Sequence, residues 1–328
     1  MRFVVYGAGA VGGVLGGRLA QHGHDVALIA RGRHLETIRT DGLRVEDPDD
    51  SVVVRLPCAG SPAELRVGDD DVVLLTMKSQ HTAAALDALA AAAPPSTPVV
   101  CVQNAVVNES TALRRFANVF GVAVMLPTQF LEPGVVQAYS APTSGLLDIG
   151  RFPGDGHAGE DPLAASIAAA FSASRLPSVV RPDIMAWKYR KLITNLGNAI
   201  EVVCGPEVRS GRLGDLVTAE GEACLDAASI ERVTVEEDRE RRGDHITWRP
   251  IGGVGRSGGS SWQSLTRGTG DVETDYLNGE IVLLGRRHGV ATPVNAALQQ
   301  LARRLATTNG RPGTYSEDDV LTLADYRY

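Results

Sequence analysis

A glycine-rich turn between two apolar segments constrains the fold of this chain more than any other feature. Residues 2–30 read RFVVYGAGAVGGVLGGRLAQHGHDVALIA, in which Gly7, Gly9 and Gly12 form a GxGxxG motif. A strand-like run precedes the motif, helical spacing follows it over residues 10–23, and a second strand-like run covers 25–30. In a parallel α/β sheet this order places the N–H groups of a helix N-terminus where they bind phosphate. We therefore predict a dinucleotide-binding loop made of Gly7, Ala8, Gly9, Ala10, Val11 and Gly12.

Each glycine of the motif has its own expected role. Gly7 allows the tight turn after the strand, and Gly9 lets the backbone approach a pyrophosphate with no side chain in between. Gly12 lets the helix pack closely on the sheet. The alternative is a glycine-rich turn of an unrelated α/β protein, which would not require the flanking strands and helix.

The second apolar run ends in Arg31, at a position where NAD-binding units usually carry an acid. An acid there accepts hydrogen bonds from the ribose hydroxyls, whereas a guanidinium binds a 2′-phosphate through two parallel hydrogen bonds. We therefore predict NADP(H) as the cofactor, and Arg33 and His34 are candidates for a further member of the phosphate pocket. The alternative is that Arg31 is a surface residue and that the protein discriminates weakly between NADP(H) and NAD(H).

The remaining sequence predicts an α/β protein with two domains. Apolar runs at 71–77 and 97–104 alternate with helical patterns up to about residue 173, and residues 42–56 are typical of a hairpin. We predict an NADP-binding domain over 1–180 with a Rossmann-type doubly wound sheet, and an all-helical substrate and catalytic domain over 181–328. The helical patterns of the second half cover 184–205, 215–243, 273–289 and the residues after Pro293. The glycine-rich stretch 252–261 is expected to be a mobile loop.

Composition excludes several classes of protein. The 328 residues carry a formal net charge of −7 without a dense basic block, so nucleic acid is not an expected partner. No apolar stretch reaches the ~18 residues of a membrane span, and the first residues lack the pattern of a signal peptide. The cysteines form no CxxC pair, and the histidines show no ligand-like grouping. We therefore expect a cytoplasmic protein with reduced thiols and no metal site.

Polar residues directly follow two apolar runs of the predicted sheet. Lys78 follows the run that ends in Met77, and Asn104 follows the next run along the chain. Ligands bind at the carboxyl ends of strands in doubly wound sheets, so both side chains are candidate contacts of the cofactor. The alternative is that each residue simply begins a loop.

A second candidate site lies on a predicted helix that contains WKYRKLITNLGN. The spacing of its polar residues places them on one stripe of the helix: Lys188, Lys191, Asn195 and Asn198. Asparagine inside a helix costs roughly 0.5 kcal/mol relative to alanine, which favours a polar cleft with a ligand over a merely solvated face. The solvated face remains the alternative.

Reduction of a ketone requires a donor of a hydrogen bond and a proton to the carbonyl oxygen. Lys191 is our candidate because a lysine is protonated at neutral pH and its ammonium provides both charge and proton. A carboxylate would hold this ammonium in place. Glu273 is the leading candidate, and Asp275 is its local rival.

Together these segments resemble the ketopantoate reductase family (2-dehydropantoate 2-reductases). The resemblance rests on an ordered set of segments: GAGAVGG, the arginine after the second strand, TMKSQ, VQNAV, WKYRKLITN, SSW, ETDYLNG and HGVATPVN. It implies NADPH-dependent reduction of ketopantoate to pantoate, on the way to pantothenate and coenzyme A. It also allows a homodimer, since members of the family often pair.

The resemblance implies specific roles for residues that match. Lys78 and Asn104 would contact the cofactor, Lys191 would protonate the 2-oxo group, and Glu273 would complete the surroundings of the lysine and the cofactor. Asn195 and Ser261 would bind the substrate, and we add Asn198 as a further substrate contact.

Some positions depart from the family pattern. Asn104 is followed by Ala105 rather than glycine, residue 199 is alanine where a second asparagine is usual, and Trp262 stands in SSW. These departures keep open a paralogous reductase of another 2-oxo acid. A non-catalytic NADP sensor is the alternative from a different functional class, against which the presence of Lys191 and Glu273 argues.

Overall fold

The computed structural model describes residues 1–154, 161–256, 258–268 and 270–325. The chain divides into two compact units, the first made of Met1–Lys188 with Val235–Arg256 and the second of Tyr189–Thr234 with Ser257–Tyr328. The division differs in detail from the sequence-based boundary at 180/181, because the first unit continues through Lys188 and takes up a later segment of the chain. The functional roles assigned to the two domains stay predictions.

The first unit is built on a predominantly parallel sheet. Its strand order is β11-β8-β7-β6-β1-β2-β5, and only the β11–β8 pair is antiparallel. This arrangement confirms the predicted Rossmann-type sheet. The strands are β1 Arg2–Tyr6, β2 Val26–Ile29, β5 Cys58–Ala59, β6 Asp71–Leu75, β7 Val99–Cys101, β8 Val119–Met125 and β11 Leu146–Phe152.

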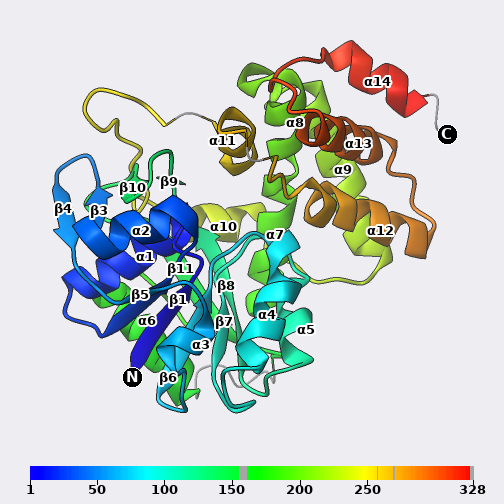
Figure 1. Ribbon diagram of the computed structural model, residues 1–328. Helices are drawn as coiled ribbons and strands as arrows, with labels where there is room; N and C mark the ends of the chain where they lie inside the picture. Colours follow the sequence, from blue (N-terminus) through cyan, green and yellow to red (C-terminus); the bar gives the residue numbers. More distant parts are fainter. Residues whose placement is uncertain (155–160, 257, 269, 326–328) are drawn as a thin grey trace. The chain divides into compact units, whose positions relative to one another are not determined.

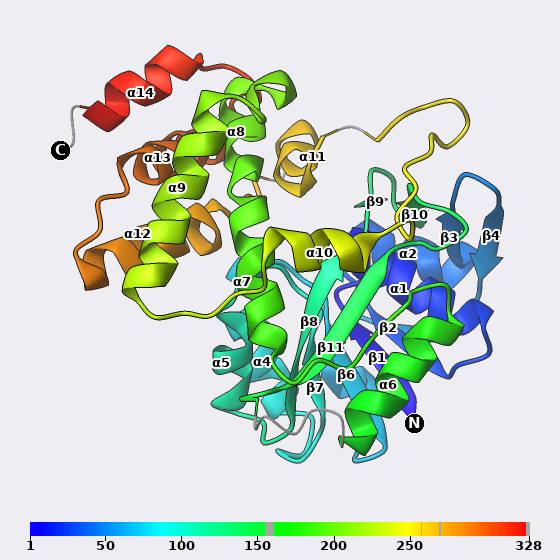
Figure 2. The same ribbon diagram turned by 180° about the vertical axis from the view of Figure 1, so that it is seen from behind.

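Alternate residues of these strands face two separate hydrophobic clusters. Phe3 and Val5 of β1 belong to a cluster with α1 and α6, whereas Val4 and Tyr6 belong to a cluster with α4 and α5. Figure 1 shows α4 and α5 beside β7 and β8, and Figure 2 shows α6 on the other side of the sheet. The helices of this unit are α1 Ala10–Gln21, α2 Gly32–Asp41, α3 Pro62–Leu65, α4 Thr82–Ala90, α5 Asn108–Leu113, α6 Pro162–Ala173 and α10 Val235–Arg242, with the 3-10 turn η1 Ser79–His81.

Helix α1 lies between the main sheet and a second, smaller sheet. A Cβ atom on Gly16 would stand 2.8 Å from Leu28 of β2, and one on Gly13 would stand 2.5 Å from Val136 of β10. A Cβ atom on Gly17 would collide with Val45 of β3. The glycines of α1 therefore allow close packing on two sheets, where the sequence predicted packing on one.

The second sheet has the order β4-β3-β10-β9. Its strands are β3 Leu43–Glu46, β4 Ser51–Val54, β9 Thr128–Gln129 and β10 Val135–Ala138. The β3–β4 pair confirms the predicted hairpin at 42–56, and the Asp47 side chain closes its turn by accepting the N–H of Asp49 at 2.7 Å and of Asp50 at 2.9 Å.

The segment 235–256 belongs to the first unit because it supplies charge and hydrogen bonds there. Arg241 of α10 binds the buried Asp148 of β11 through two hydrogen bonds, with its Nε at 2.8 Å and its Nη2 at 2.6 Å from the carboxylate oxygens. Arg181 binds the same carboxylate at 2.9 Å through its Nε. Further along, the N–H of Arg249 donates to the carbonyl oxygen of Tyr139 at 3.0 Å.

The second unit is helical, as predicted. Its helices are α7 Ile184–Asn195, most of which lies in this unit, and α8 Gly197–Cys204, α9 Arg212–Ala227, α11 Ser260–Thr266, α12 Asn278–His288, α13 Pro293–Thr307 and α14 Glu317–Asp325, with the 3-10 turns η3 Pro206–Val208 and η4 Thr274–Tyr276. Gly289 ends α12 with a φ of +73°, and the helical pattern predicted over 273–289 also ends at this residue.

Two predicted helices were wrong in their extent. The pattern at 184–205 forms two helices that are interrupted at Leu196, and the pattern at 215–243 forms α9 and α10 with a break after Ala228. The expected mobile loop at 252–261 contains the first residues of α11 and an isolated bridge between Ile251 and Val254, while Ser257 lies outside the described residues. Helices α2 and α14 and the short helix α3 were not predicted.

The described ranges contain no helix that is both long and apolar enough to cross a bilayer. Each cysteine is a free thiol, and burial raises the pKa of Cys58, Cys204 and Cys224 to about 11. These three thiols are therefore protonated at neutral pH, which argues against a nucleophilic cysteine among them.

Candidate functional site

The glycine loop of the first unit has the geometry that a phosphate group requires. Gly7 has a φ of +108°, and a Cβ atom there would stand 2.9 Å from the backbone nitrogen of Met77. A Cβ atom on Gly12 would collide with the oxygen of Gly7 and the hydroxyl of Thr76, whereas one on Gly9 would meet no atom within 4 Å. Two glycines thus serve the fold, and Gly9 faces open space where a ligand can approach the backbone.

The N-terminus of α1 is also suited to an anion. No side chain caps this helix, and its first turn carries no acidic residue. The N–H groups and the partial positive charge of the helix end therefore meet no carboxylate from the first turn. The residues of the loop fit the pyrophosphate of a dinucleotide.

His34 occupies a different place from the one predicted. Its Nδ1 accepts the N–H of Gly134 at 2.8 Å, which leaves the proton on Nε2, 2.6 Å from the backbone oxygen of Ala8. The ring is buried, and burial lowers the pKa of the imidazole. His34 therefore supports the glycine loop as a buried, neutral side chain. Of the two candidates for the 2′-phosphate pocket, Arg33 and His34, the structure excludes His34.

Arg31 and Arg33 are exposed beside this loop. Arg31 follows β2 and is the N-cap residue of α2, with an extended backbone, and Gly32 turns the chain with a φ of +53°. Both guanidinium groups are accessible to a ligand at the carboxyl end of β2. Arg31 stays the candidate for a 2′-phosphate, and Arg33 stays its candidate neighbour.

A buried polar network joins the two loops that carry Lys78 and Asn104. Gln103 donates from Nε2 to the backbone oxygen of Met77 at 2.8 Å, and Asn108 donates from Nδ2 to the backbone oxygen of Asn104 at 2.9 Å. Thr82 connects them, since it accepts from Gln103 at 2.8 Å and donates to Asn108 at 2.9 Å. The network fixes both loops at the carboxyl edge of neighbouring strands β6 and β7.

Ala105, which replaces the usual glycine, retains a glycine-like backbone. Its φ is +66°, in the left-handed region that alanine rarely adopts. The residue directly follows Asn104, so the strain lies beside a candidate ligand of the cofactor.

Lys188 shares a face of α7 with Lys191, but it is buried and does not belong to a polar cleft or a solvated face. Its side chain is 2% exposed, and its Nζ lies 2.7 Å from Oε1 of the fully buried Glu109. The ammonium also donates to the backbone oxygens of Gln103 at 2.7 Å and Val122 at 3.3 Å. The contact with Glu109 is an ion pair without hydrogen-bond geometry, and within the described residues neither carboxylate oxygen has a donor. Lys188 is thus a buried residue whose contacts fix the first part of α7 within the first unit.

The other polar residues of the predicted stripe lie in the second unit. Lys191 and Asn195 belong to α7 and Asn198 to α8, so the interruption at Leu196 separates the two asparagines. Both asparagines are buried, whereas Lys191 is partly exposed. Burial excludes a simple solvated face for them.

Asn278 fixes the interruption between α7 and α8. Its Nδ2 donates to the backbone oxygen of Leu196 at 3.2 Å and to the side chain of Asn295 at 2.9 Å. Asn295 in turn donates to Glu220 at 2.7 Å. Asn278 lies in the segment ETDYLNG, and no role was predicted for it from the sequence. Its partner Asn295 is buried and Glu220 is half-buried, and both lie far from Asn278 along the chain.

Glu273 is 4% exposed and stands at the N-cap position of η4. Its rival Asp275 is exposed and accepts from Gln299 at 2.8 Å, with Arg303 at 3.6 Å. Burial thus favours Glu273 over Asp275 as a residue of a site. The pairing of Lys191 with Glu273 stays a prediction.

Ser261 is 2% exposed in the first turn of α11. Trp262 turns its ring toward the chain just before this helix, because a Cβ atom on Gly258 would stand 2.5 Å from its Cγ. The indole therefore packs against the glycine-rich segment.

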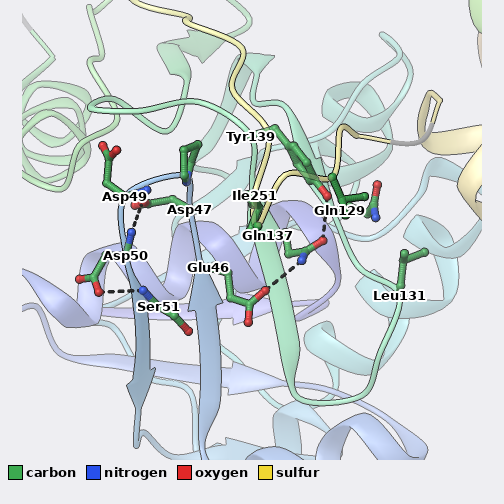
Figure 3. A pocket seen from close by; sticks show the side chains of 13 residues that line it. Glu46, Asp47, Asp49, Asp50, Ser51, Gln129, Leu131, Gln137, Tyr139 and Ile251 are labelled. Atoms are coloured by element: carbon green, nitrogen blue, oxygen red, sulfur yellow. Dashed lines mark hydrogen bonds between the residues drawn. The ribbon is translucent and has the colours of Figure 1, made fainter.

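A cavity of about 620 Å³ lies elsewhere in the first unit, over the second sheet (Figure 3). The acidic turn 46–51 lines one side, and the rest is lined by Gln129, Leu131, Gln137, Tyr139, Ile251, Gly252 and Val254. Gln137 donates to Glu46 at 2.9 Å between the paired strands β10 and β3. The cavity contains none of the predicted site residues, and its acidic lining does not suit a phosphate. Among the residues that the structure describes, no three His, Cys, Asp or Glu side chains gather as a metal site would need.

Comparison with known proteins agrees with this fold. A family described as ketopantoate reductase PanE/ApbA matches residues 3–154, and its C-terminal domain matches residues 183–306. The 2-dehydropantoate 2-reductase of Halobacterium salinarum is 30% identical over 94% of this chain and 100% of its own length. That of Pyrococcus horikoshii is 27% identical over 94% and 99%, respectively.

Solved structures show the same architecture. A PanE/ApbA family ketopantoate reductase from Ralstonia eutropha JMP134 superposes with a TM-score of 0.77 at 28% identity, covering 94% of this chain and 99% of that one. The D-mandelate dehydrogenase solved with NADH and anilino(oxo)acetate superposes with a TM-score of 0.78 at 24% identity, covering 94% and 99%. The matched family covers both halves of the sequence. The chain therefore belongs to the ketopantoate reductase PanE/ApbA family of oxidoreductases.

Proposed function

We propose that this protein reduces ketopantoate to pantoate with NADPH. The observation that carries the proposal is the glycine loop, in which Gly9 faces open space at the uncapped N-terminus of α1. The names of the relatives support the substrate. The product would serve the synthesis of pantothenate and coenzyme A.

The residues of the chain would divide the chemistry between them. A bound nicotinamide coenzyme would supply the hydride. Lys191 would donate a proton to the 2-oxo oxygen and stabilise the charge that develops there, with Glu273 holding the ammonium. Asn195, Asn198 and Ser261 would bind the oxo acid. Lys78 and Asn104 would contact the coenzyme from the loops that the buried network fixes.

The preference for NADPH rests on Arg31. Arg31 is exposed and follows the carboxyl end of β2, at the position where NAD-binding units usually carry an acid. Arg31→Ala should weaken binding of NADPH about ten-fold or more and leave binding of NADH nearly unchanged. Equal losses of affinity for NADPH and NADH would show that Arg31 does not determine the preference between the two coenzymes.

The deciding experiment is a panel of 2-oxo acids assayed with NADPH and with NADH, followed by the absorbance of the reduced coenzyme. We expect the highest kcat/KM with ketopantoate and NADPH. A preference for another 2-oxo acid would select a paralogous reductase, which Ala199 and Trp262 make worth testing. Binding of NADPH without turnover of any acid would favour a sensor.

A variant separates the chemistry from coenzyme binding. Lys191→Ala should abolish turnover while the Kd for NADPH stays within about two-fold of the wild type. Turnover by this variant would contradict the proposed role of the lysine. Light scattering of the same preparations would test for the homodimer that the family resemblance allows.

A further inference from the structure

Glu201 of α8 is a buried carboxylate for which the proposed chemistry has no role. The residue is 8% exposed, and its Oε2 accepts the backbone N–H of Gly259 at 2.9 Å. Gly259 is the N-cap residue of α11, two positions before Ser261. The carboxylate therefore ties α8 to the start of the helix that carries a predicted substrate ligand.

The contact between these segments is close. A Cβ atom on Gly259 would stand 2.5 Å from Oε2 of Glu201 and 3.5 Å from Oδ1 of Asn198. Asn198 precedes Glu201 by one helical turn, so both side chains lie on one face of α8. The start of α11 is thus packed on the same face that carries a second predicted substrate ligand.

Arg209 neutralises this carboxylate. Its Nη1 lies 2.7 Å from Oε1 of Glu201, and its Nη2 donates to the backbone oxygen of Thr194 at 3.4 Å. A Cβ atom on Gly197 would stand 3.1 Å from Nε of Arg209, so the guanidinium lies across the junction of α7 and α8. Thr194 adjoins Asn195 in the sequence. The ion pair between Arg209 and Glu201 therefore connects the segments that carry Asn195, Asn198 and Ser261, which are predicted to bind the substrate.

We propose that Glu201 is a positioning residue that holds Ser261 beside Asn198 for the binding of an oxo acid. The inference rests on the proposed function. A charge-assisted hydrogen bond from a buried N–H fixes the first turn of α11 more firmly than a neutral one. The pairing with Arg209 keeps this fixed carboxylate from repelling the carboxylate of the substrate.

The chain offers a matched control in the first unit. Asp161 accepts the N–H groups of Leu163 and Ala164 at the start of α6 and pairs with Arg151. The side-chain exposures are nearly the same, 31% and 11% for Arg151 and Asp161 against 31% and 10% for Arg209 and Glu201. Arg151 pairs in register with Phe120 near the amino end of β8, away from the strand ends that carry the glycine loop.

The experiment compares Glu201→Ala, Glu201→Gln and Asp161→Ala in the full chain. Glu201→Ala should raise the KM of the accepted oxo acid about ten-fold or more, with the Kd for the coenzyme unchanged. Glu201→Gln keeps an acceptor for Gly259 and should recover part of the loss. Asp161→Ala should lower Tm without moving the KM. An unchanged KM in Glu201→Ala, or the same rise in Asp161→Ala, overturns the inference.

Hydrogen exchange gives a readout that does not depend on turnover. Amides in a peptide covering residues 258–267 should exchange faster in Glu201→Ala than in the wild type and should be unaffected in Asp161→Ala. Unchanged exchange there would show that Glu201 does not hold α11. A wild-type protein that turned over no oxo acid would overturn the proposed function, while this measurement still decides the structural tie.

Discussion

The imidazole of His34 links two backbone segments, since its Nε2 lies 2.6 Å from the oxygen of Ala8 and its Nδ1 accepts the N–H of Gly134 at 2.8 Å. Only the neutral ring can make both contacts, and burial lowers the pKa of His34 in the folded state. The unfolded chain therefore binds a proton more readily than the folded chain. The contribution of His34 to stability is complete above a pH of about 6.5 and is lost as the pH falls below that value.

Urea unfolding between about pH 5 and pH 7.5 tests this relationship. The free energy of unfolding should fall more steeply toward low pH in the wild type than in His34→Gln, which lacks the titrating ring. The exposed His288 provides the control, because His288→Gln should retain the wild-type slope. Parallel slopes for the wild type and His34→Gln would contradict the assigned protonation state.

Gly9 and Gly12 should respond differently to the same substitution. Gly9→Ala places a methyl group in open space, so Tm should stay within about 1 °C while the affinity for NADPH falls at least about ten-fold. Gly12→Ala drives a methyl group into the oxygen of Gly7 and the Thr76 hydroxyl and should lower Tm itself. Calorimetric titration and thermal unfolding measure the two effects. Undiminished affinity in Gly9→Ala would argue against a pyrophosphate at this loop.

Ala105→Gly should stabilise the protein. Glycine adopts a φ of +66° without the steric cost that alanine bears, which is worth about 1 kcal/mol in the free energy of unfolding. Ala91 is exposed and ends α4 with a φ of −78°, so Ala91→Gly should instead lower the free energy by about 0.5 kcal/mol. In urea titrations, the free energy of unfolding should rise in Ala105→Gly and fall in Ala91→Gly. A change in the same direction for both variants would show that backbone strain at Ala105 is negligible.

Lys188 and Glu109 should behave as a coupled buried pair. Lys188→Met leaves the carboxylate of Glu109 buried without its cation, at a cost of about 3–5 kcal/mol. The double variant Lys188→Met, Glu109→Leu buries no charge and should recover much of that loss. Additive effects in this double-mutant cycle, followed by urea unfolding, would mean that the ion pair does not contribute.

The sheet and the glycine loop were predictable because their determinants are local. Apolar strands, the GxGxxG spacing and a terminal glycine on α12 each specify structure within a few residues. The break between α7 and α8 was not predictable in this way, because helical spacing continues through Leu196 and the interruption is fixed by Asn278, far along the chain. Helix α2 was missed because it is short and mostly polar, with little of its surface buried.

The roles of single polar residues were the least predictable part of the site. Sequence placed His34 in a phosphate pocket and Lys188 on a polar stripe, and both are buried. Their partners Gly134 and Glu109 lie on segments whose proximity follows only from the assembled fold. The types of residue were informative, but the environment of each depended on tertiary packing.

The charges around Asp148 affect how the gene can be divided for expression. A truncation after residue 180 would remove both Arg181 and Arg241, so a side chain that is 3% exposed would lose both of its guanidinium partners. Such a fragment would leave the carboxylate of Asp148 without a cation and would uncover the part of β11 on which Arg181 and Ile184 pack, so it should be recovered as insoluble material. A stable coenzyme-binding fragment would need residues 235–256 joined after Lys188 by a linker.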